Sequence, residues 1–289
     1  MKTYRSPSSL LFSFVVYLVM ALTLAVCLIP FLYMLALSVS SPKAIIHNEV
    51  FLIPKGLNLE AYIQIFSYPN FFNAYGNTFI YTLGGTAISL TLMILFAYPL
   101  SKTRLKGVKV VMRLVIFSMF FSGGLIPNYL LVSSLGLTNT RLAMLIPFAI
   151  NQFNLILLIN FFKSIPMDLE EAAIIDGLDY KGILIRIILP LSTAALATVG
   201  LYTAVFFWND WFHGLIYLKS SQFPVMLFLR NIVTGTSMVG DAAGSGDKST
   251  IAISIKSAVI ITSTLPIIIL YPFLQRFFVK GVMIGAVKG

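Results

Sequence analysis

The chain has 289 residues, of which 58% are hydrophobic and only 10% are charged. Because an ordinary soluble domain carries roughly 25% charged residues, this composition excludes a protein whose surface lies mostly in water and indicates lipid as the surrounding medium. The net charge of +10 does not indicate nucleic-acid binding, since the basic residues are dispersed along the chain and are not gathered with stacking aromatic residues.

Charged residues are missing from six long stretches of the sequence, the shortest of which has 19 residues. A helix that rises ~1.5 Å per residue needs roughly 20 residues to cross about 30 Å of hydrocarbon. Transmembrane strands would alternate apolar and polar residues, whereas the run Leu90–Phe96 does not. The prediction is an all-α integral membrane protein in which residues 1–289 form one transmembrane domain. About six transmembrane helices are expected, at residues 10–37, 72–100, 110–132, 141–162, 190–217 and 257–278.

The basic residues predict the orientation of these helices. The first apolar run continues past Cys27 to Leu37, longer than the ~7–15-residue core of a cleaved signal peptide, so a retained first helix is predicted. Six spans place both chain ends on one side of the membrane. If that side is the cytoplasm, 13 of the 20 Lys and Arg residues fall in cytoplasmic segments, in agreement with the positive-inside rule. Both termini are therefore predicted to be cytoplasmic.

Residues 163–190, between the fourth and fifth predicted spans, contain five acidic residues and interrupt the apolar pattern. Pro166 suits the first turn of a helix, and Gly177 supplies a left-handed stop. A second short helix is expected through Tyr180 to Ile188, and Pro190 marks the return to the membrane. This pattern predicts a cytoplasmic helix-turn-helix. One face of its first helix is expected to meet a partner surface, through the residues at helical spacing: Leu169, Ala172, Ala173 and Asp176.

The same segment resembles the EAA loop of bacterial ABC importer membrane subunits. Glu171-Ala172-Ala173, then Gly177, then Ile187, Leu189 and Pro190 stand at the positions of that motif. In this family the loop docks into a groove on the ATP-binding subunit, so the resemblance implies that Glu171 through Gly177 form a coupling helix. The residues that it implies for coupling to the ATPase subunit are Glu170, Glu171, Ala172, Ala173, Asp176, Gly177, Ile187, Leu189 and Pro190.

Three further segments resemble the sugar-importing branch of the family, of which the maltose transporter's inner-membrane subunits are the best-known example. They are Gly123–Pro127, Trp208–Phe212 and the tail from Gln275 to Gly289, and the first of them looks like the subgroup that imports complex or polymeric saccharides. The resemblance implies a permease subunit of the bacterial cytoplasmic (inner) membrane. It also implies three partners. The first is a second permease subunit, which would form a heterodimer, with a homodimer as the alternative. The others are a pair of ABC ATPase subunits and an extracytoplasmic solute-binding protein that delivers a sugar or an oligosaccharide, neutral or acidic.

The sequence itself lacks the chemistry of an ATPase. Gly246-Asp247-Lys248-Ser249 only superficially follows a P-loop, because Asp247 stands where the motif needs glycine. Two histidines and one cysteine offer no recognisable spacing for a metal site or a catalytic triad. We therefore expect no catalytic residue, metal or cofactor in this chain, and we expect ATP and Mg²⁺ to bind the partner subunit.

Polar and aromatic residues inside the predicted spans are the candidates for a substrate pathway, because polar groups in lipid are costly unless they pair or face a cavity. The same residues could instead bridge helices or lie at the membrane interface. The candidates are Asn73, Asn77 and Tyr81 on the second span, Asn151, Gln152 and Asn154 on the fourth, and Trp208, Asn209, Asp210 and Trp211 on the fifth.

Other transport classes remain as alternatives. An ABC importer permease for another solute, such as an amino acid or a phosphonate, would carry the same EAA loop. An ion-coupled secondary transporter also uses several helical spans, but it usually needs ionisable groups within them, and the span centres here have none. A membrane-embedded enzyme would need a catalytic constellation that the sequence does not offer.

Overall fold

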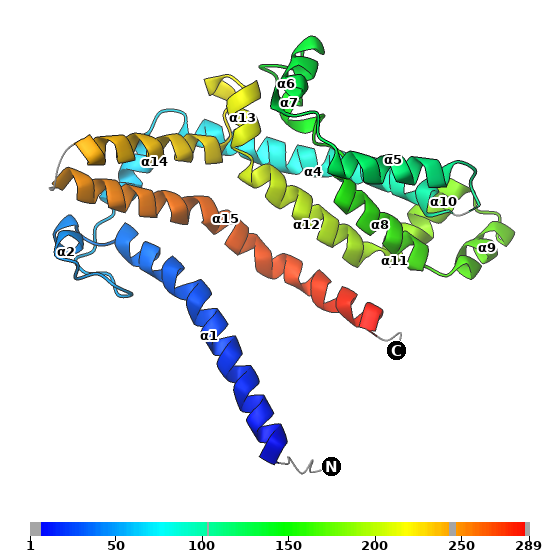
Figure 1. The fold of residues 1–289 in the computed structure, drawn as a ribbon, viewed down its shortest axis with the longest axis horizontal. Coiled ribbons are helices and arrows are strands. Elements are labelled where there is room, and N and C mark those ends of the chain that lie inside the picture. The colour runs from blue at the N-terminus through cyan, green and yellow to red at the C-terminus, as the bar shows by residue number, and fades with distance from the viewer. Residues whose placement is uncertain (1–6, 103, 243–246, 287–289) are drawn as a thin grey trace. The chain divides into compact units, whose positions relative to one another are not determined.

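A computed structural model describes residues 7–102, 104–242 and 247–286, and every regular element in these residues is a helix (Figure 1). The prediction of an all-α protein is confirmed for this part of the chain. The residues divide into two compact units, Met1–Pro69 with Asn231–Thr264 and Asn70–Arg230 with Leu265–Gly289. The basic residues Lys2 and Arg5, Gly246 of the P-loop-like segment and the last three residues of the tail lie outside the described residues.

The first unit contains α1 (Pro7–Ser38), α2 (Pro42–Ile46) and α3 (Glu60–Ser67), with most of α14 (Val225–Ala242) and the first part of α15 (Asp247–Ala286). The Ser38 hydroxyl at the end of α1 lies 2.8 Å from the Tyr62 hydroxyl of α3. Ser257 of α15 donates a hydrogen bond to the sulfur of Met34 at 3.5 Å. These bonds tie the end of the first long apolar helix to the segments around it.

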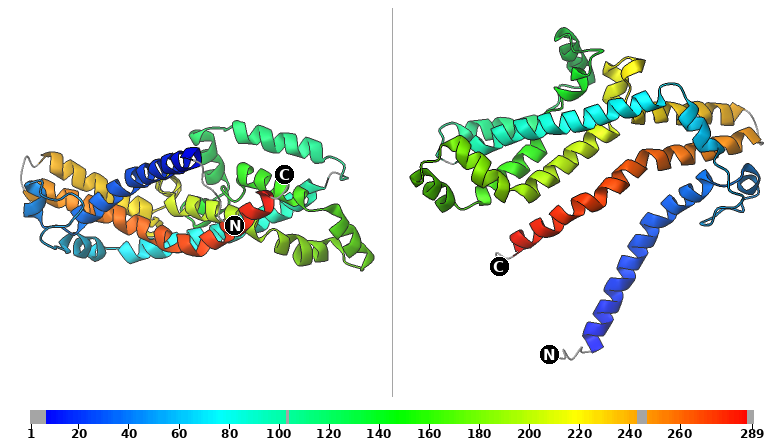
Figure 2. Two further views of the ribbon diagram at one scale, coloured as in Figure 1. Left: turned by 90° about the horizontal axis from the view of Figure 1, so that it is seen from below. Right: turned by 180° about the vertical axis from the view of Figure 1, so that it is seen from behind.

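In the second unit the long helix α4 (Phe71–Ser101) packs against α8 (Gln152–Ser164) and α12 (Thr193–Asn209), which lie alongside it in Figures 1 and 2. The buried residues of α4 include several small ones, among them Ala74, Gly85, Ser89 and Ala97. Small residues allow helix backbones to approach closely in a membrane. Gly85 is the tightest point, because a Cβ atom there would lie 2.5 Å from the Phe207 ring of α12.

The loop between α8 and α12 folds as the sequence predicts. It contains α9 (Met167–Ile175), α10 (Tyr180–Ile183), a π-helical turn (Leu184–Ile188) and the three-residue α11 (Leu189–Leu191). Pro166 is the N-cap of α9, and Gly177 follows its end with φ +84°. The predicted helix-turn-helix is therefore present, with the π-helical turn just ahead of Pro190.

Three of the predicted transmembrane segments are interrupted in the structure and do not form single continuous helices. Segment 110–132 is split into α5 (Val108–Phe120) and α6 (Leu125–Ser134), which meet at 116° next to Gly124, at φ +89°. Segment 141–162 begins with the four-residue α7 (Leu142–Leu145), and the chain is not helical again until the Asn151 cap of α8. Segment 190–217 is divided among α11, α12 and α13 (Phe212–Tyr217). Turn-forming Gly, Pro and Asn residues outweigh apolar composition at these places.

Three helices in the described part of the chain are long and apolar enough to cross a membrane: Leu10–Ser38, Phe71–Ser101 and Ala252–Leu270. Two bent pairs bring this number to five if each pair counts as one span: Val108–Phe120 with Leu125–Ser134, and Tyr180–Leu191 with Thr193–Asn209. α8 has only 13 residues and is about 20 Å long at ~1.5 Å per residue. The predicted number of six spans is therefore not confirmed.

Candidate functional site

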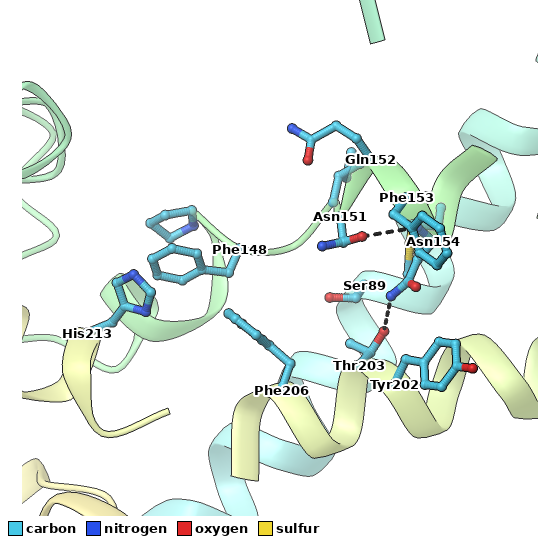
Figure 3. Close-up of a pocket in the computed structure, with 13 residues that line it drawn as sticks. Ser89, Phe148, Asn151, Gln152, Phe153, Asn154, Tyr202, Thr203, Phe206 and His213 are labelled. Atoms are coloured by element: carbon cyan, nitrogen blue, oxygen red, sulfur yellow. Dashed lines mark hydrogen bonds between the residues drawn. The ribbon is translucent and has the colours of Figure 1, made fainter. Parts of the chain in front are cut away.

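A cavity of about 510 Å³ lies within the second unit, where α4, α8, α12 and α13 meet the non-helical segment before α8 (Figure 3). Its volume falls in the range of ~300–1,000 Å³ that is typical of small-molecule sites. Its wall combines aromatic rings with amide, hydroxyl and imidazole groups, and is formed by Ser89, Met93, Pro147, Phe148, Ile150, Asn151, Gln152, Phe153, Asn154, Tyr202, Thr203, Phe206 and His213.

The three predicted polar residues of the fourth span all lie on this cavity. The Asn151 side chain caps α8, because its Oδ1 accepts a hydrogen bond from the Asn154 backbone N–H at 3.0 Å. This bond leaves the Asn151 amide nitrogen to face away from the helix (Figure 3). The buried Asn154 amide donates to the Thr203 hydroxyl at 3.4 Å and so joins α8 to α12. Gln152, in the first turn of α8, adds a second amide to the wall.

An aspartate–histidine pair supports the opposite wall. His213 Nδ1 lies 2.9 Å from both carboxylate oxygens of buried Asp210, and Asp210 also accepts the His213 backbone N–H at 3.1 Å. The imidazole packs on the Phe148 ring with 4.0 Å between ring centroids. Because Nδ1 is held by the carboxylate, Nε2 is the ring nitrogen that remains for a ligand.

Sequence reasoning named Asp210 but missed His213. The sequence positions of the histidines and the cysteine match neither a metal site nor a catalytic triad, so they give no reason to select this histidine. The available signal is the separation of three residues between an aspartate and a histidine at the start of a short helix, where the carboxylate can reach both the ring and the backbone N–H. That signal predicts an oriented imidazole, but it does not predict which surface the imidazole faces.

The other predicted pathway residues lie away from the cavity wall. Asn73, Asn77 and Tyr81 donate hydrogen bonds at 2.9, 3.1 and 2.8 Å to backbone carbonyls of the 221–222 segment and thereby anchor it to α4. Trp208 is buried against the rings of Tyr75 and Phe79. The remaining two line no part of this cavity, Asn209 at the end of α12 and Trp211, whose ring lies 4.1 Å from the Arg230 guanidinium.

A second candidate region is the loop built around α9. Its end is a complete Schellman motif, in which the Leu178 N–H donates to the Ala173 carbonyl and the Gly177 N–H donates to the Ile174 carbonyl. Asp179 then caps α10 by accepting the Gly182 N–H at 2.8 Å. These backbone contacts fix the angle between the two helices of the loop without help from another chain.

Two ion pairs hold α9 to the end of α4. Lys102 pairs with Glu170, whose side chain is only 10% exposed, and the Lys102 ammonium also lies 4.6 Å from the Tyr98 ring centroid. Arg104 pairs with Glu171 at 2.9 Å, but both side chains are more than half exposed. The Glu170 carboxylate is therefore paired within its own chain and shielded from solvent, whereas the Glu171 side chain is exposed.

The predicted partner face of α9 needs one correction. Ala173 is 4% exposed and packs in the core of its own unit, so it cannot share the partner face with its predicted neighbours. Leu169, Ala172 and Ile175 are exposed and follow one another at intervals of three residues, which places them on one side of the helix. Ile187 and Leu189 pack partly buried against the same core, and Asp176 and Pro190 are exposed.

Within the described residues, no group of three or more His, Cys, Asp or Glu side chains could hold a metal ion. The cavity and the α9 loop are built from hydrogen-bonding groups, aromatic rings and a few ion pairs.

The chain is similar to several known transport proteins, although no family model matches it. Protein LplC of Bacillus subtilis (strain 168) is 44% identical over 92% of this chain and 90% of its own length. The polygalacturonan/rhamnogalacturonan transport system permease protein YtcP of the same organism is 41% identical over 96% of this chain and 99% of its own. Among solved structures, a chain of a bacterial ABC transporter involved in the import of the acidic polysaccharide alginate matches with a TM-score of 0.84 and 33% identity, over 96% of this chain and 100% of that one.

Proposed function

The chain belongs to the family of ABC transporter permease proteins, and we propose that it moves a saccharide across a bacterial cytoplasmic membrane as one subunit of an ATP-driven importer. The observation that carries this proposal is the cavity of the second unit, where amide and hydroxyl groups alternate with the rings of Phe148, Phe153 and Phe206. Hydroxyl-rich sugar rings need hydrogen-bonding side chains together with flat apolar surfaces. The relatives named above for polysaccharide transport support the same cargo class.

ATP hydrolysis in this proposal belongs to a separate pair of nucleotide-binding subunits, which bind ATP and Mg²⁺. α9 is the coupling helix that docks on one of them. Its exposed apolar side, formed by Leu169, Ala172 and Ile175, meets the partner groove, and Glu171 is free to exchange Arg104 for a basic group of the partner. Glu170 and Ala173 keep the helix seated on α4 and the core.

The remaining partners follow from the same family. A second permease subunit completes the translocation pathway as a heterodimer, and a loaded binding protein docks on the extracytoplasmic side of the two permease subunits. Both termini and α9 face the cytoplasm. ATP-driven closure of the nucleotide-binding subunits moves α9, the outer gate opens to receive the saccharide, and hydrolysis resets the pathway inward.

The test is ATPase activity of the complete complex in proteoliposomes. Saccharide presented with its binding protein is expected to stimulate hydrolysis, and Ile175→Asp is expected to reduce stimulation at least about tenfold, because a charge would enter an apolar contact. Lys181→Asp, also exposed in this loop but off the α9 stripe, is the matched control. Stimulation that survives Ile175→Asp would contradict the docking role of α9, and a complex that responds only to non-sugar solutes would contradict the cargo.

A further inference from the structure

The polar groups that line the cavity of the second unit are hydroxyls, amides and one imidazole. Hydroxyls and amides of Ser89, Asn151 and Gln152 lie on one side, and His213 lies on the other. None of the described residues that line the cavity is Lys or Arg. An anionic group that left water for this site would find no cation to pair with, and unpaired charges are costly to bury.

Ser89 provides an independent sign that the cavity takes a hydrogen-bonding ligand. It lies on α4 and is 1% exposed, yet its hydroxyl has no hydrogen-bond partner among the described residues. Figure 3 shows this hydroxyl directed into the open space on the side of Phe148. A buried hydroxyl without a partner costs roughly 1–3 kcal/mol, so a ligand hydroxyl placed there would remove an existing penalty.

The electrostatics at the opposite wall also disfavour an anion. The His213 imidazole is backed by the buried Asp210 carboxylate, which holds Nδ1. Nδ1 faces that carboxylate, so Nε2 is the ring nitrogen that can share a hydrogen bond with a ligand. A ligand hydroxyl can both donate to and accept from Nε2, whereas a ligand carboxylate can only accept and would lie near the Asp210 charge.

We infer that the cavity binds an uncharged sugar ring and discriminates against a uronate, which deepens the proposed function and rests on it. The ring packs on the wall that the Phe148 and Phe206 side chains form together, since their centroids are 5.9 Å apart and the two rings contact each other. Its hydroxyls bond to Ser89, the Asn151 amide nitrogen and His213 Nε2. The neutral wall distinguishes this site from one built for the acidic cargo that the alginate transporter is described as importing.

Cysteine protection tests this inference in the complete complex. Cys27, the one cysteine of the chain, is replaced by alanine and Gln152 by cysteine. A thiol reagent then labels the cavity in proteoliposomes that hold the binding protein and a non-hydrolysable ATP analogue. The ligands are a uronate oligosaccharide and its carboxyl-reduced neutral counterpart, which share size and linkage. Ser118→Cys, at an exposed serine of α5 away from the cavity, is the control.

The neutral oligosaccharide is expected to slow labelling of Cys at position 152 about tenfold, corresponding to ~1.4 kcal/mol of preferential occupancy, and the uronate less than twofold. Ser89→Ala should weaken this protection, and labelling at position 118 should not respond. Equal or stronger protection by the uronate would overturn the inference and leave saccharide transport intact. Absence of protection by either sugar, while both are taken up by parallel proteoliposomes supplied with ATP, would remove the cavity from the pathway. If neither sugar is transported, the proposed function itself fails.

Discussion

Glu170 and Glu171 are adjacent in the sequence but have different surroundings, and this difference is measurable. Glu170→Gln removes a carboxylate from a pair that is largely shielded from water, leaving the Lys102 ammonium without its counter-charge. We expect a loss of about 1–3 kcal/mol in the stability of the solubilised protein. Glu171→Gln removes an exposed pair, which is worth only ~0–1 kcal/mol. Thermal unfolding of the two variants compares them directly.

A third variant separates pairing from packing at this position. Replacing both partners, in Lys102→Met with Glu170→Met, removes the stranded charge and should recover much of the loss, because apolar replacement of a whole shielded pair is often nearly neutral. Equal unfolding temperatures for Glu170→Gln and Glu171→Gln would contradict the assignment of Glu170 to an internal role.

Gly177 carries a different constraint, which is conformational. Its φ of +84° is strained for any residue with a Cβ atom, although no neighbouring atom would meet that Cβ, so Gly177→Ala should cost about 1 kcal/mol. Gly136→Ala, at φ +68° and equally open, should cost a similar amount. Only the Gly177 variant is expected to lower saccharide-stimulated ATPase activity, because it alone changes how α9 ends. Equal ATPase losses in the two variants would argue against this role.

At the scale of elements, α4 and α12 approach each other closely at Gly85. Gly85→Ala would place a methyl group 2.5 Å from the Phe207 ring, whereas Gly84→Ala would meet nothing within 4 Å. We expect Gly85→Ala to destabilise the protein by ~1–3 kcal/mol through overpacking, and Gly84→Ala to leave it unchanged or slightly more stable. Unfolding of the solubilised protein measures both. A neutral Gly85→Ala would mean that α4 and α12 can separate without cost.

The elements also show what the sequence can and cannot predict. Helix α9 was predictable because its signals are local: a proline at its start, early acidic residues, and Gly177 after its end. The interruption of segment 141–162 was not, because Pro147 and Asn151 sit in a charge-free run whose apolar composition alone favours a span. Burial of Glu170 and Ala173 depends on α4 and the core, which lie far away in sequence. Helical spacing cannot show which face of α9 turns toward them.

The predicted polar residues of the spans also differ in how well the sequence indicates their role. Asn151, Gln152 and Asn154 were predicted from polarity within an apolar run, and they do meet at one wall. Asn73, Asn77 and Tyr81 satisfy the same criterion but bond to the 221–222 backbone instead. Polarity identifies residues that need a partner, and only the fold decides whether the partner is protein or ligand.

At the scale of the whole molecule, one compact unit contains both the cavity that is proposed to bind the substrate and the loop that is proposed to contact the ATPase subunit. The second unit holds both the cavity and the α9 loop, and α4 and α8 connect them, since Ser89 and Asn154 face the cavity while Lys102 and Phe162 lie near α9. In the proposed mechanism, a movement of α9 would reach the cavity wall through α4 and α8. This arrangement is suited to a permease whose substrate site must respond to an ATPase on the membrane surface.

The most direct measurement of this account is the accumulation of a labelled oligosaccharide inside proteoliposomes that carry this chain, its second permease subunit, the ATPase subunits and the binding protein. The account predicts uptake against a gradient that requires ATP and Mg²⁺ on the side of α9, and that stops when Ile175→Asp breaks the coupling contact. Uptake that continues without ATP, or follows an imposed ion gradient instead, would contradict it.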